Sequence, residues 1–266
     1  LPGDVFVSRD PDPVLQQDED FHDGGISAND CFKPVSRYFD RILAPSQLLT
    51  ALPRAIAVLT DPVQCGPVTL ALPQDVQAEA YDFPAEFFAS ALVRVRAPQP
   101  EALELDAVAS LLRAAKQPML VAGGGVLYSD GGADALRRFA EAHRLPVTET
   151  QAGKSALPWD HPLQAGAIGV TGSTAANELA RNADLVVAVG TRLSDFTTGS
   201  HSLFAQARLV AINVNAFDAL KWRASVVHGD AATTLDGLST RLVGWTATAA
   251  WQQKAVREAE AWRAQV

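Results

Sequence analysis

The chain has 266 residues, 48% of them hydrophobic, and a net charge of −8, which is the composition of a globular protein with one large or two modest cores. The acidic balance argues against a nucleic-acid partner, because that role requires clustered Lys and Arg. Two distant cysteines, no membrane-length apolar run and no signal-peptide pattern predict a cytoplasmic protein without a membrane partner, a disulfide framework or structural zinc.

The pattern of residues 1–76 predicts part of an α/β domain. The expected elements are a strand at 4–8, a helix at 45–60 with Pro45 in its first turn, and a strand at 66–73. An acidic stretch at 10–23 is typical of a solvated loop. Two strands and one helix do not close a domain, and the chain starts at Leu1 rather than at Met, so we expect the domain to begin upstream.

Residues 77–99 are expected to form a linker with a proline-rich end, and 100–243 a central α/β domain. That domain is predicted to contain helices at 101–115, 132–143, 173–182 and 231–243 and strands at 118–122, 145–149, 184–189, 208–214 and 225–228. Strands that alternate with helices indicate a doubly wound parallel sheet. Residues 244–266 form a polar helical tail whose three tryptophans pack either locally or on a surface outside this chain.

The central domain's first strand, 118–122, is apolar without alternation and ends at Gly123 and Gly124, which is typical of a strand buried on both faces. The carboxyl end of such a strand is where open α/β sheets bind ligands, so both glycines are cofactor-binding candidates. The spacing is not G-x-G-x-x-G, and we expect the next helix to begin only near Gly132. The alternative is that the glycines serve the turn alone.

A second glycine-rich loop, 166–172, precedes a predicted helix. Its candidates are Gly169, Thr171 and Gly172, with Ser173 or Thr174 as the helix cap, an arrangement that suits an anion. The loop has no phosphate-binding lysine, so it is not a Walker A loop.

A third loop, 190–199, follows a predicted strand and contributes the candidates Gly190, Arg192 and Asp195. Arg192 could bind phosphate, and the alternative is an ion pair with Asp195 that closes the loop. The five histidines lack metal-ligand spacing, so no metal site is predicted. His143 is expected either to pack on the buried face of its helix or to serve as a cation at the helix C-terminus.

Several segments together resemble the acetohydroxyacid synthase type of thiamine-diphosphate enzyme. Residues 66–76 resemble the end of the pyrimidine-binding domain, and 154–163, 166–172 and 184–190 follow the order of the Rossmann-like central domain. Within that superfamily, the segments 12–17 and 27–39 are most similar to the trihydroxycyclohexane-1,2-dione hydrolases of myo-inositol catabolism.

This resemblance implies an enzyme that uses thiamine diphosphate and Mg²⁺ and works as a homodimer or homotetramer. It implies hydrolysis of a C–C bond in a cyclic dione, giving 5-deoxy-glucuronate. The family holds the diphosphate with a Gly-Asp-Gly motif followed by Asn, whereas this chain has Gly229-Asp230-Ala231 and no Asn after Asn215. We therefore expect a fragment that is inactive alone, with 244–266 leading toward a missing diphosphate-binding domain.

In relatives, the loop equivalent to Asn29, Asp30, Phe32 and Lys33 lies near the cofactor of a neighbouring subunit, which makes Asn29, Asp30 and Lys33 catalytic candidates by resemblance. The alternative is a polar loop that anchors the linker. Thr171 replaces a histidine of the FAD-binding relatives, which puts FAD or ADP in doubt and leaves a purely structural central domain as an alternative.

Two other functions stay open at this stage. One is a carboligase or decarboxylase of the same superfamily, which would act on pyruvate. The other is a free-standing nucleotide-binding module that uses the three glycine loops to bind ADP, FAD or NAD.

Overall fold

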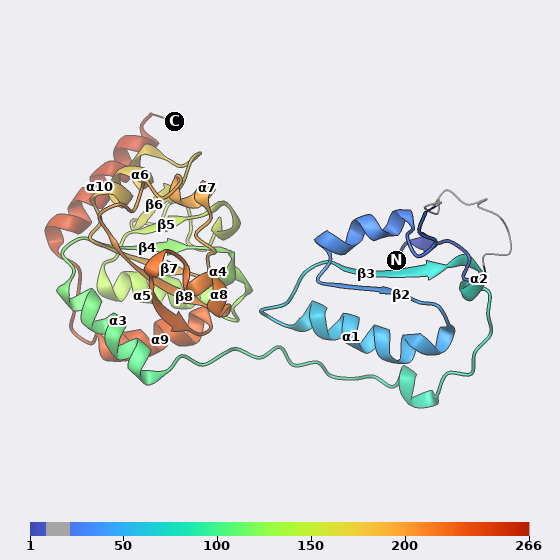
Figure 1. The fold of residues 1–266 in the computed structure, drawn as a ribbon. Helices are drawn as coiled ribbons and strands as arrows, with labels where there is room; N and C mark the ends of the chain where they lie inside the picture. The colour runs from blue at the N-terminus through green and yellow to red at the C-terminus, as the bar shows by residue number, and fades with distance from the viewer. Residues whose placement is uncertain (9–21, 266) are drawn as a thin grey trace. The chain divides into compact units, whose positions relative to one another are not determined.

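The chain divides into two compact units in the computed structural model, which describes residues 1–8 and 22–265. Unit 1 comprises Leu1–Arg96 and unit 2 comprises Ala97–Val266 (Figure 1). Most of the acidic stretch predicted as a loop at 10–23 lies outside the described residues. In the described part of the chain, no helix is both long enough and apolar enough to cross a membrane.

Unit 1 contains a three-stranded parallel sheet in the order β1-β3-β2. Its strands are β1 (Gly3–Asp4), β2 (Tyr38–Arg41) and β3 (Val68–Pro73). The 3-10 helix η1 (Ala28–Val35) precedes β2, and α1 (Leu48–Thr60) connects β2 to β3. A short 3-10 turn, η2 (Pro45–Gln47), leads into α1, so the helix predicted at 45–60 with Pro45 in its first turn is confirmed.

In unit 1, one strand is shorter than predicted and another was not predicted. The strand predicted at 4–8 ends at Asp4, because the backbone N–H groups of Val7 and Ser8 donate to the Asp75 carboxylate, each at 3.1 Å, instead of to a neighbouring strand. Strand β2 was not predicted, since its four residues include a charged pair and follow a segment of turn formers.

The two faces of the small sheet differ in chemistry. The α1 face is apolar and packs Ile42, Leu70 and Val76 against Ala51 and Ala55 of the helix. η1 contacts β2 and β3 on the other side of the sheet from α1 (Figure 1). This division follows from the alternation of side chains along a strand.

Unit 2 contains a six-stranded parallel sheet in the order β6-β5-β4-β7-β8-β9. The strands are β4 (Pro118–Ala122), β5 (Val147–Glu149), β6 (Gln164–Ala167), β7 (Leu185–Val189), β8 (Arg208–Asn213) and β9 (Ser225–His228). The doubly wound parallel sheet is confirmed, although β6 was not predicted. The strand order reverses between β4 and β7, which is the point where open α/β sheets place ligands.

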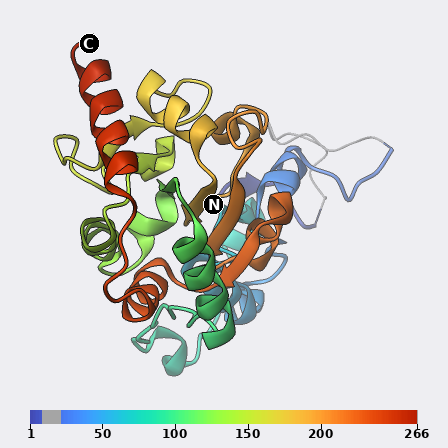
Figure 2. The ribbon, with the colours of Figure 1, turned by 90° about the vertical axis from the view of Figure 1, so that its left-hand side faces the viewer.

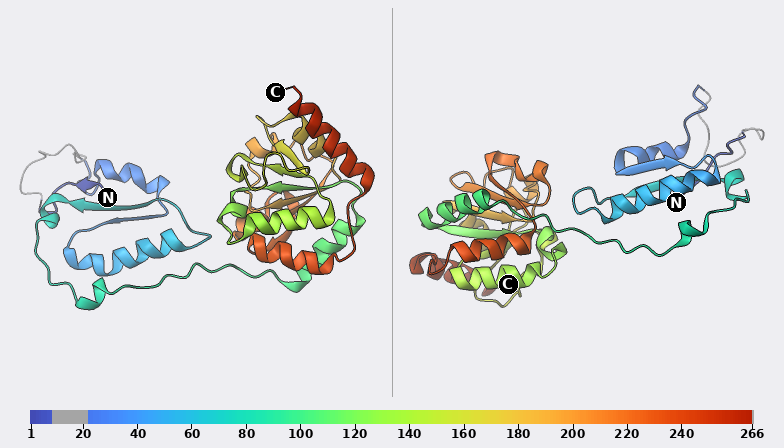
Figure 3. Two further views of the ribbon diagram at one scale, coloured as in Figure 1. Left: turned by 180° about the vertical axis from the view of Figure 1, so that it is seen from behind. Right: turned by 90° about the horizontal axis from the view of Figure 1, so that it is seen from below.

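Helices cover both faces of this sheet. They are α3 (Ala102–Ala114), α5 (Gly132–His143), α6 (Thr174–Asn182), α9 (Ala231–Arg241) and α10 (Ala249–Arg263). α3, α5 and α9 pack on one face, and α5 and α9 lie side by side in Figure 3. α6 packs on the other face, and α10 runs along α6 and β6 at the sheet's edge (Figure 2).

Shorter helical turns occupy the connecting loops. They are α2 (Gln74–Gln77), η3 (Ala85–Phe88), α4 (Gly124–Tyr128), η4 (Gln151–Gly153), α7 (Asp195–Thr198), α8 (Ala216–Ala219) and η5 (Lys221–Arg223). α4 corrects one expectation, because a helix begins directly after Gly123 and not only near Gly132. Extended backbone at Gly123 makes that residue the N-cap of α4, which places the helix at the very end of β4.

Two of the three tryptophans in the C-terminal tail pack inside unit 2. Trp251 is 3% exposed, and its indole Nε1 donates to the carbonyl of Pro118 at 2.7 Å. Trp245 packs against the same core, and its carbonyl lies 2.9 Å from Nδ1 of the buried His143. Local packing therefore explains these two rings, and His143 is a packing residue as expected.

Candidate functional site

The carboxyl edge of the sheet in unit 1 carries a network of charged side chains. Arg41 is the last residue of β2 and Asp4 the last of β1, and parallel strands bring these ends to one edge. Arg41 Nε donates to Asp4 Oδ2 at 2.5 Å, and its Nη2 donates to Ser27 Oγ at 2.9 Å and to Asp30 Oδ1 at 3.3 Å. Its Nη1 donates to the carbonyl of Gly25 at 3.2 Å. The guanidinium of Arg41 thus connects the ends of β1 and β2 to the start of η1.

The three catalytic candidates lie on η1, next to this network. Ser27 caps η1 with a reciprocal capping box, in which the Asp30 carboxylate accepts from the Ser27 N–H at 2.8 Å. Asn29 is 4% exposed, and its Nδ2 donates to the carbonyl of Gly3 at 2.6 Å. Lys33 Nζ lies 2.8 Å from Asp30 Oδ1 and 5.3 Å from the centre of the Phe39 ring. The structure therefore brings all three candidates together.

Burial, charge and hydrogen bonds shift the pKa values of three groups in this network. Burial raises the pKa of the Asp4 carboxyl, but hydrogen bonds from Arg41 and Ser27 outweigh it and hold the pKa below its ordinary 3.8. Burial acts in the same way on Asp30, and hydrogen bonds from Lys33 and Ser27 lower its pKa. Burial lowers the pKa of Arg41, but its bonds to Asp4 and Asp30 raise it overall. The network is ionised at neutral pH.

Sequence reasoning missed Arg41 and Asp4. Neither residue belongs to a recognisable motif, and both gain meaning only from their place at the ends of β1 and β2, the two strands that flank β3. The one signal that could have suggested the strand is the aromatic pair Tyr38-Phe39, a residue type that is enriched in strands.

At the point where the strand order of unit 2 reverses, the candidate glycines pack against each other. The N–H of Gly123 donates to the carbonyl of Val189 at 2.8 Å, and that of Gly125 donates to the carbonyl of Gly190 at 2.9 Å. A Cβ on Gly125 would lie 2.7 Å from Gly190 Cα, and one on Gly123 would overlap the Gly190 carbonyl. A Cβ on Gly124 would make a looser but still tight contact, 3.1 Å from the carbonyl oxygen of Ala152. The backbones of the β4 and β7 loops are thus in direct contact, which favours the interpretation that these glycines serve the turn.

The loop at 166–172 is also held by internal contacts. Gly169 has φ 114°, its N–H donates to Asn177 Oδ1 at 3.1 Å, and its carbonyl accepts from Asn177 Nδ2 at 2.9 Å. A Cβ on Gly172 would lie 2.7 Å from the Ala167 carbonyl. Ser173 is the cap of α6, because its Oγ accepts from the N–H of Ala176 at 3.0 Å. Thr171 is exposed beside these packed glycines.

The loop at 190–199 presents the remaining candidates at the carboxyl end of β7. Arg192 and Asp195 are both exposed, and within the described residues they form no ion pair with each other, so that alternative is wrong. The backbone of Phe196 accepts from the N–H of Val170 at 2.9 Å, which ties this loop to the preceding glycine loop. Arg192 is thus an exposed cation at this edge.

The residues present do not fit a diphosphate with its metal ion. Asp230, the acid of the Gly-Asp pair, is 8% exposed and caps α9, where its Oδ1 accepts from Ser129 Oγ at 2.8 Å and from the N–H of Ala232 at 3.1 Å. Throughout residues 1–8 and 22–265, no group of three or more His, Cys, Asp or Glu side chains could hold a metal ion. Asp230 thus serves the fold.

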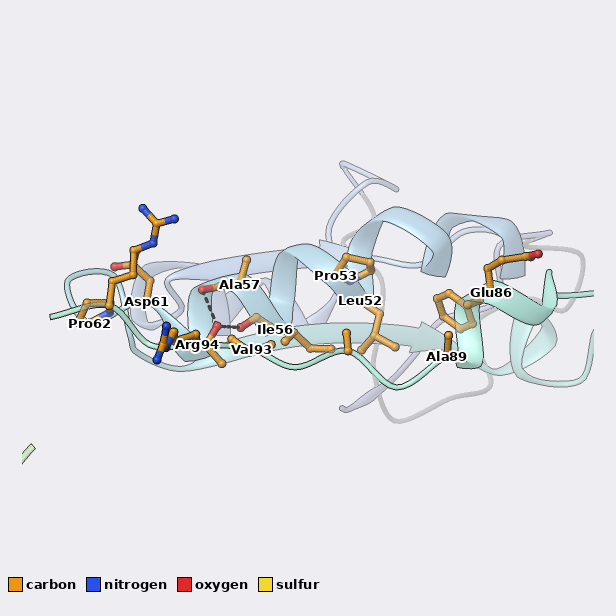
Figure 4. A pocket seen from close by; sticks show the side chains of 14 residues that line it. Leu52, Pro53, Ile56, Ala57, Asp61, Pro62, Glu86, Ala89, Val93 and Arg94 are labelled. Carbon is orange, nitrogen blue, oxygen red and sulfur yellow. Dashed lines mark hydrogen bonds between the residues drawn. The ribbon is translucent and has the colours of Figure 1, made fainter. Parts of the chain in front are cut away.

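A groove in unit 1 was not predicted from the sequence. It has a volume of about 660 Å³ and lies between α1 and the segment 86–96, which begins within η3 (Figure 4). Leu52, Ile56 and Val93 contribute apolar side chains to its lining, and Arg94 lies toward one end (Figure 4). Its lining is mainly apolar, unlike the charged edge of the same sheet.

Comparison with known proteins gives the family. The family model for the thiamine pyrophosphate enzyme central domain matches residues 105–238, half of the chain. A protein of Geobacillus thermodenitrificans named 3D-(3,5/4)-trihydroxycyclohexane-1,2-dione hydrolase is 50% identical over 242 residues, 91% of this chain and 38% of the relative. A protein of Clostridium perfringens with the same name is 46% identical over 265 residues, 99% of this chain and 41% of the relative.

The chain thus spans about two fifths of the length of these curated relatives. The matched segment 105–238 runs from α3 to α9 and includes all six strands of the large sheet. By its fold and by this match, the chain belongs to the family of the thiamine pyrophosphate enzyme central domain.

Proposed function

We propose that this chain is part of a thiamine-diphosphate-dependent hydrolase that cleaves a C–C bond of trihydroxycyclohexane-1,2-dione. The observation that carries the proposal is the extent of the similarity. It covers 99% of the chain at 46% identity to a protein of that name, so unit 1 is shared with the relative as well as the central domain. A superfamily resemblance restricted to the central domain would not favour this substrate over pyruvate.

The two units have different parts in the proposed enzyme. The charged edge of unit 1 offers side chains that can contact a polar substrate. In unit 2, by contrast, the glycine loops after β4 and β7 pack against each other through their backbones. We propose that unit 1 contributes to the active site and that unit 2 is a scaffold without a nucleotide. This division is supported by the close packing of Gly123 and Gly125 on Gly190.

Thiamine diphosphate, when bound, supplies a sink for the electrons of the broken C–C bond. The described residues do not fit its diphosphate or Mg²⁺, so we place that site in the part of the relatives' length that this chain does not span. We accordingly expect the 266-residue chain to be inactive alone.

We further propose that the full-length protein is a cytoplasmic homodimer or homotetramer. Support comes from η1, whose side chains Phe32 and Val35 are 42% and 64% exposed and would be covered in an assembly. Light scattering after gel filtration of the full-length protein tests the number of subunits, and a monomer would contradict the proposal.

The test of the proposed activity compares substrates. The full-length protein is assayed with the cyclic dione and with pyruvate, with and without thiamine diphosphate and Mg²⁺. We expect dione hydrolysis that depends on both additions, and no turnover of pyruvate. Pyruvate turnover without dione hydrolysis would instead establish the carboligase or decarboxylase alternative.

A further inference from the structure

η1 is held on its sheet by polar contacts instead of a hydrophobic core. Of its eight residues, only Asn29 is buried. Its inward contacts are with polar or charged partners, such as the 2.8 Å contact between Ser36 Oγ, just after η1, and Thr69 Oγ1 on β3. The position of η1 therefore depends on a few hydrogen bonds and ion pairs, while the core of unit 1 lies on the opposite face.

Arg41 makes the largest set of these contacts. Its guanidinium bonds to Asp4, Gly25, Ser27 and Asp30, and its side chain is 20% exposed. Only a planar group with several fixed donors can serve these acceptors together, which is the property that separates arginine from lysine. The Asp4 side chain is fully buried, so Arg41 is paired with a carboxylate in the interior of unit 1.

The same contacts rank the three catalytic candidates. Asn29 is buried, with its amide donating to the Gly3 carbonyl. The Asp30 carboxylate accepts from Ser27, Arg41 and Lys33. Lys33 has a side chain that is 55% exposed, and its ammonium carries three N–H donors, of which one can point to Asp30. Among the three candidates, Lys33 alone has donors available to a ligand.

We propose that Arg41 is a positioning residue that acts through Asp30 to hold the Lys33 ammonium where it donates hydrogen bonds to oxygen atoms of the cyclic dione. This inference rests on the proposed function. Asn29 and Asp30 then orient Lys33 and do not contact the substrate, and Phe39 supports the ammonium from below with its ring.

The first test is amide hydrogen exchange on the 266-residue chain, which needs no substrate. Arg41→Ala leaves Asp4 buried without its partner, so the milder Asp30→Asn is measured beside it. Arg94→Ala is the control, because it removes one positive charge from an exposed position. We expect both network variants to speed exchange across 25–36 by about tenfold or more, with α1 and the control unchanged. Unchanged exchange across 25–36 in both variants would overturn the proposal.

The second test is a double-mutant cycle in the full-length protein with the cyclic dione. We expect Lys33→Met and Arg41→Ala each to lower kcat/KM by about tenfold, and the double variant to lose no more than about a further twofold, because both remove the same interaction. If Arg41→Ala does not fold, Asp30→Asn replaces it in the cycle. Arg41→Lys is expected to restore only part of the activity.

The outcomes separate the two proposals. Losses that multiply in the double variant would show that Arg41 does not act through Lys33, which overturns the positioning role. If the unaltered protein does not hydrolyse the dione, the proposed function fails, whereas the exchange experiment still decides whether Arg41 orders the segment that carries Lys33.

Discussion

The two parallel sheets of this chain end in different kinds of edge. In unit 1 the strand ends carry Asp4 and Arg41, which form an ionised network with Asp30 of η1. In unit 2 the ends of β4 and β7 carry glycines, whose backbones pack together and hydrogen-bond. Charged side chains at a sheet edge can donate hydrogen bonds to a ligand. Loops that pack backbone against backbone instead hold the strand ends together.

If unit 2 is a scaffold, as proposed, the topological position of a loop is not sufficient to make it a site. The reversal of strand order between β4 and β7 is where a ligand would be sought first. Here the backbones of the β4 and β7 loops pack against each other at that place, whereas the edge of the smaller sheet carries the ion pair of Lys33 and Asp30. The following predictions test this contrast, beginning with the largest expected effect.

Asp4→Ala should destabilise unit 1 by about 3 kcal/mol, because it removes one partner of a largely buried ion pair and leaves Arg41 without its main acceptor. The change is measured from hydrogen exchange of amides in β2 and β3. Tryptophan fluorescence should not respond to unfolding of unit 1, because all five tryptophans lie in unit 2. Stability of unit 1 within 0.5 kcal/mol of the unaltered chain, a rough margin for surface sites, would show that the network does not hold this edge.

Gly123→Ala should destabilise unit 2 by about 2 kcal/mol, since the new Cβ meets the backbone of Gly190, which cannot move aside as a side chain can. Urea unfolding followed by tryptophan fluorescence measures it. Gly131→Ala is the matched control: Gly131 has φ 67° with open space around it, so only the backbone strain of about 1 kcal/mol applies. Equal effects at the two positions would argue against close packing of the β4 and β7 loops.

The carboxylates of the two units should respond to pH in opposite directions. Asp4 and Asp30 have lowered pKa values, so they contribute stability above pH 3.8 that is lost as pH falls through their folded-state pKa values. Burial raises the pKa of Glu149 above 4.5 despite hydrogen bonds from the N–H groups of Leu157 and Ser155, so its contribution is present below pH 4.5 and lost as pH rises through the raised value.

Carboxyl chemical shifts in a pH titration by NMR measure these values. On acidification, Glu149 should take up its proton before Asp4 and Asp30 do, and Glu149→Gln should flatten the pH dependence of unit 2 stability above pH 4.5. Protonation of Asp30 ahead of Glu149 would contradict the described contacts.

Arg192→Ala should have the smallest effect, with stability changed by less than about 0.5 kcal/mol, because the side chain is exposed and has no ion-pair partner among the described residues. Calorimetric titration of the unaltered chain with FAD and with ADP should show no micromolar binding. Binding that Arg192→Ala abolishes would support the nucleotide-module alternative.

Much of the fold of unit 2 is predictable because buried parallel strands are continuous apolar runs separated by helices of the usual length. The short strands β2 and β6 could not be predicted in this way, because β2 contains Asp40 and Arg41 and β6 contains glycine. The site was predictable only in part. Resemblance suggested Asn29, Asp30 and Lys33 as candidates, but Arg41, which bonds to Asp30, lies on a strand that the sequence analysis did not predict.

The glycine loops present a different difficulty, and their role in cofactor binding stays a prediction. Gly123, Gly190 and Gly169 were selected because glycine allows a ligand to approach the backbone closely, but it allows another loop to do so equally well. Sequence cannot separate these cases, because both require the same missing Cβ. Only the three-dimensional arrangement shows that Gly190 occupies the space beside Gly123 and Gly125.

The most direct test of the division between the units is the kcat/KM of the full-length protein for the cyclic dione, measured for Lys33→Met in unit 1 and for Arg192→Ala in unit 2. The contacts described above predict a loss of about tenfold for Lys33→Met and no change for Arg192→Ala. A loss for Arg192→Ala with full activity in Lys33→Met would contradict the account and place the working edge in unit 2.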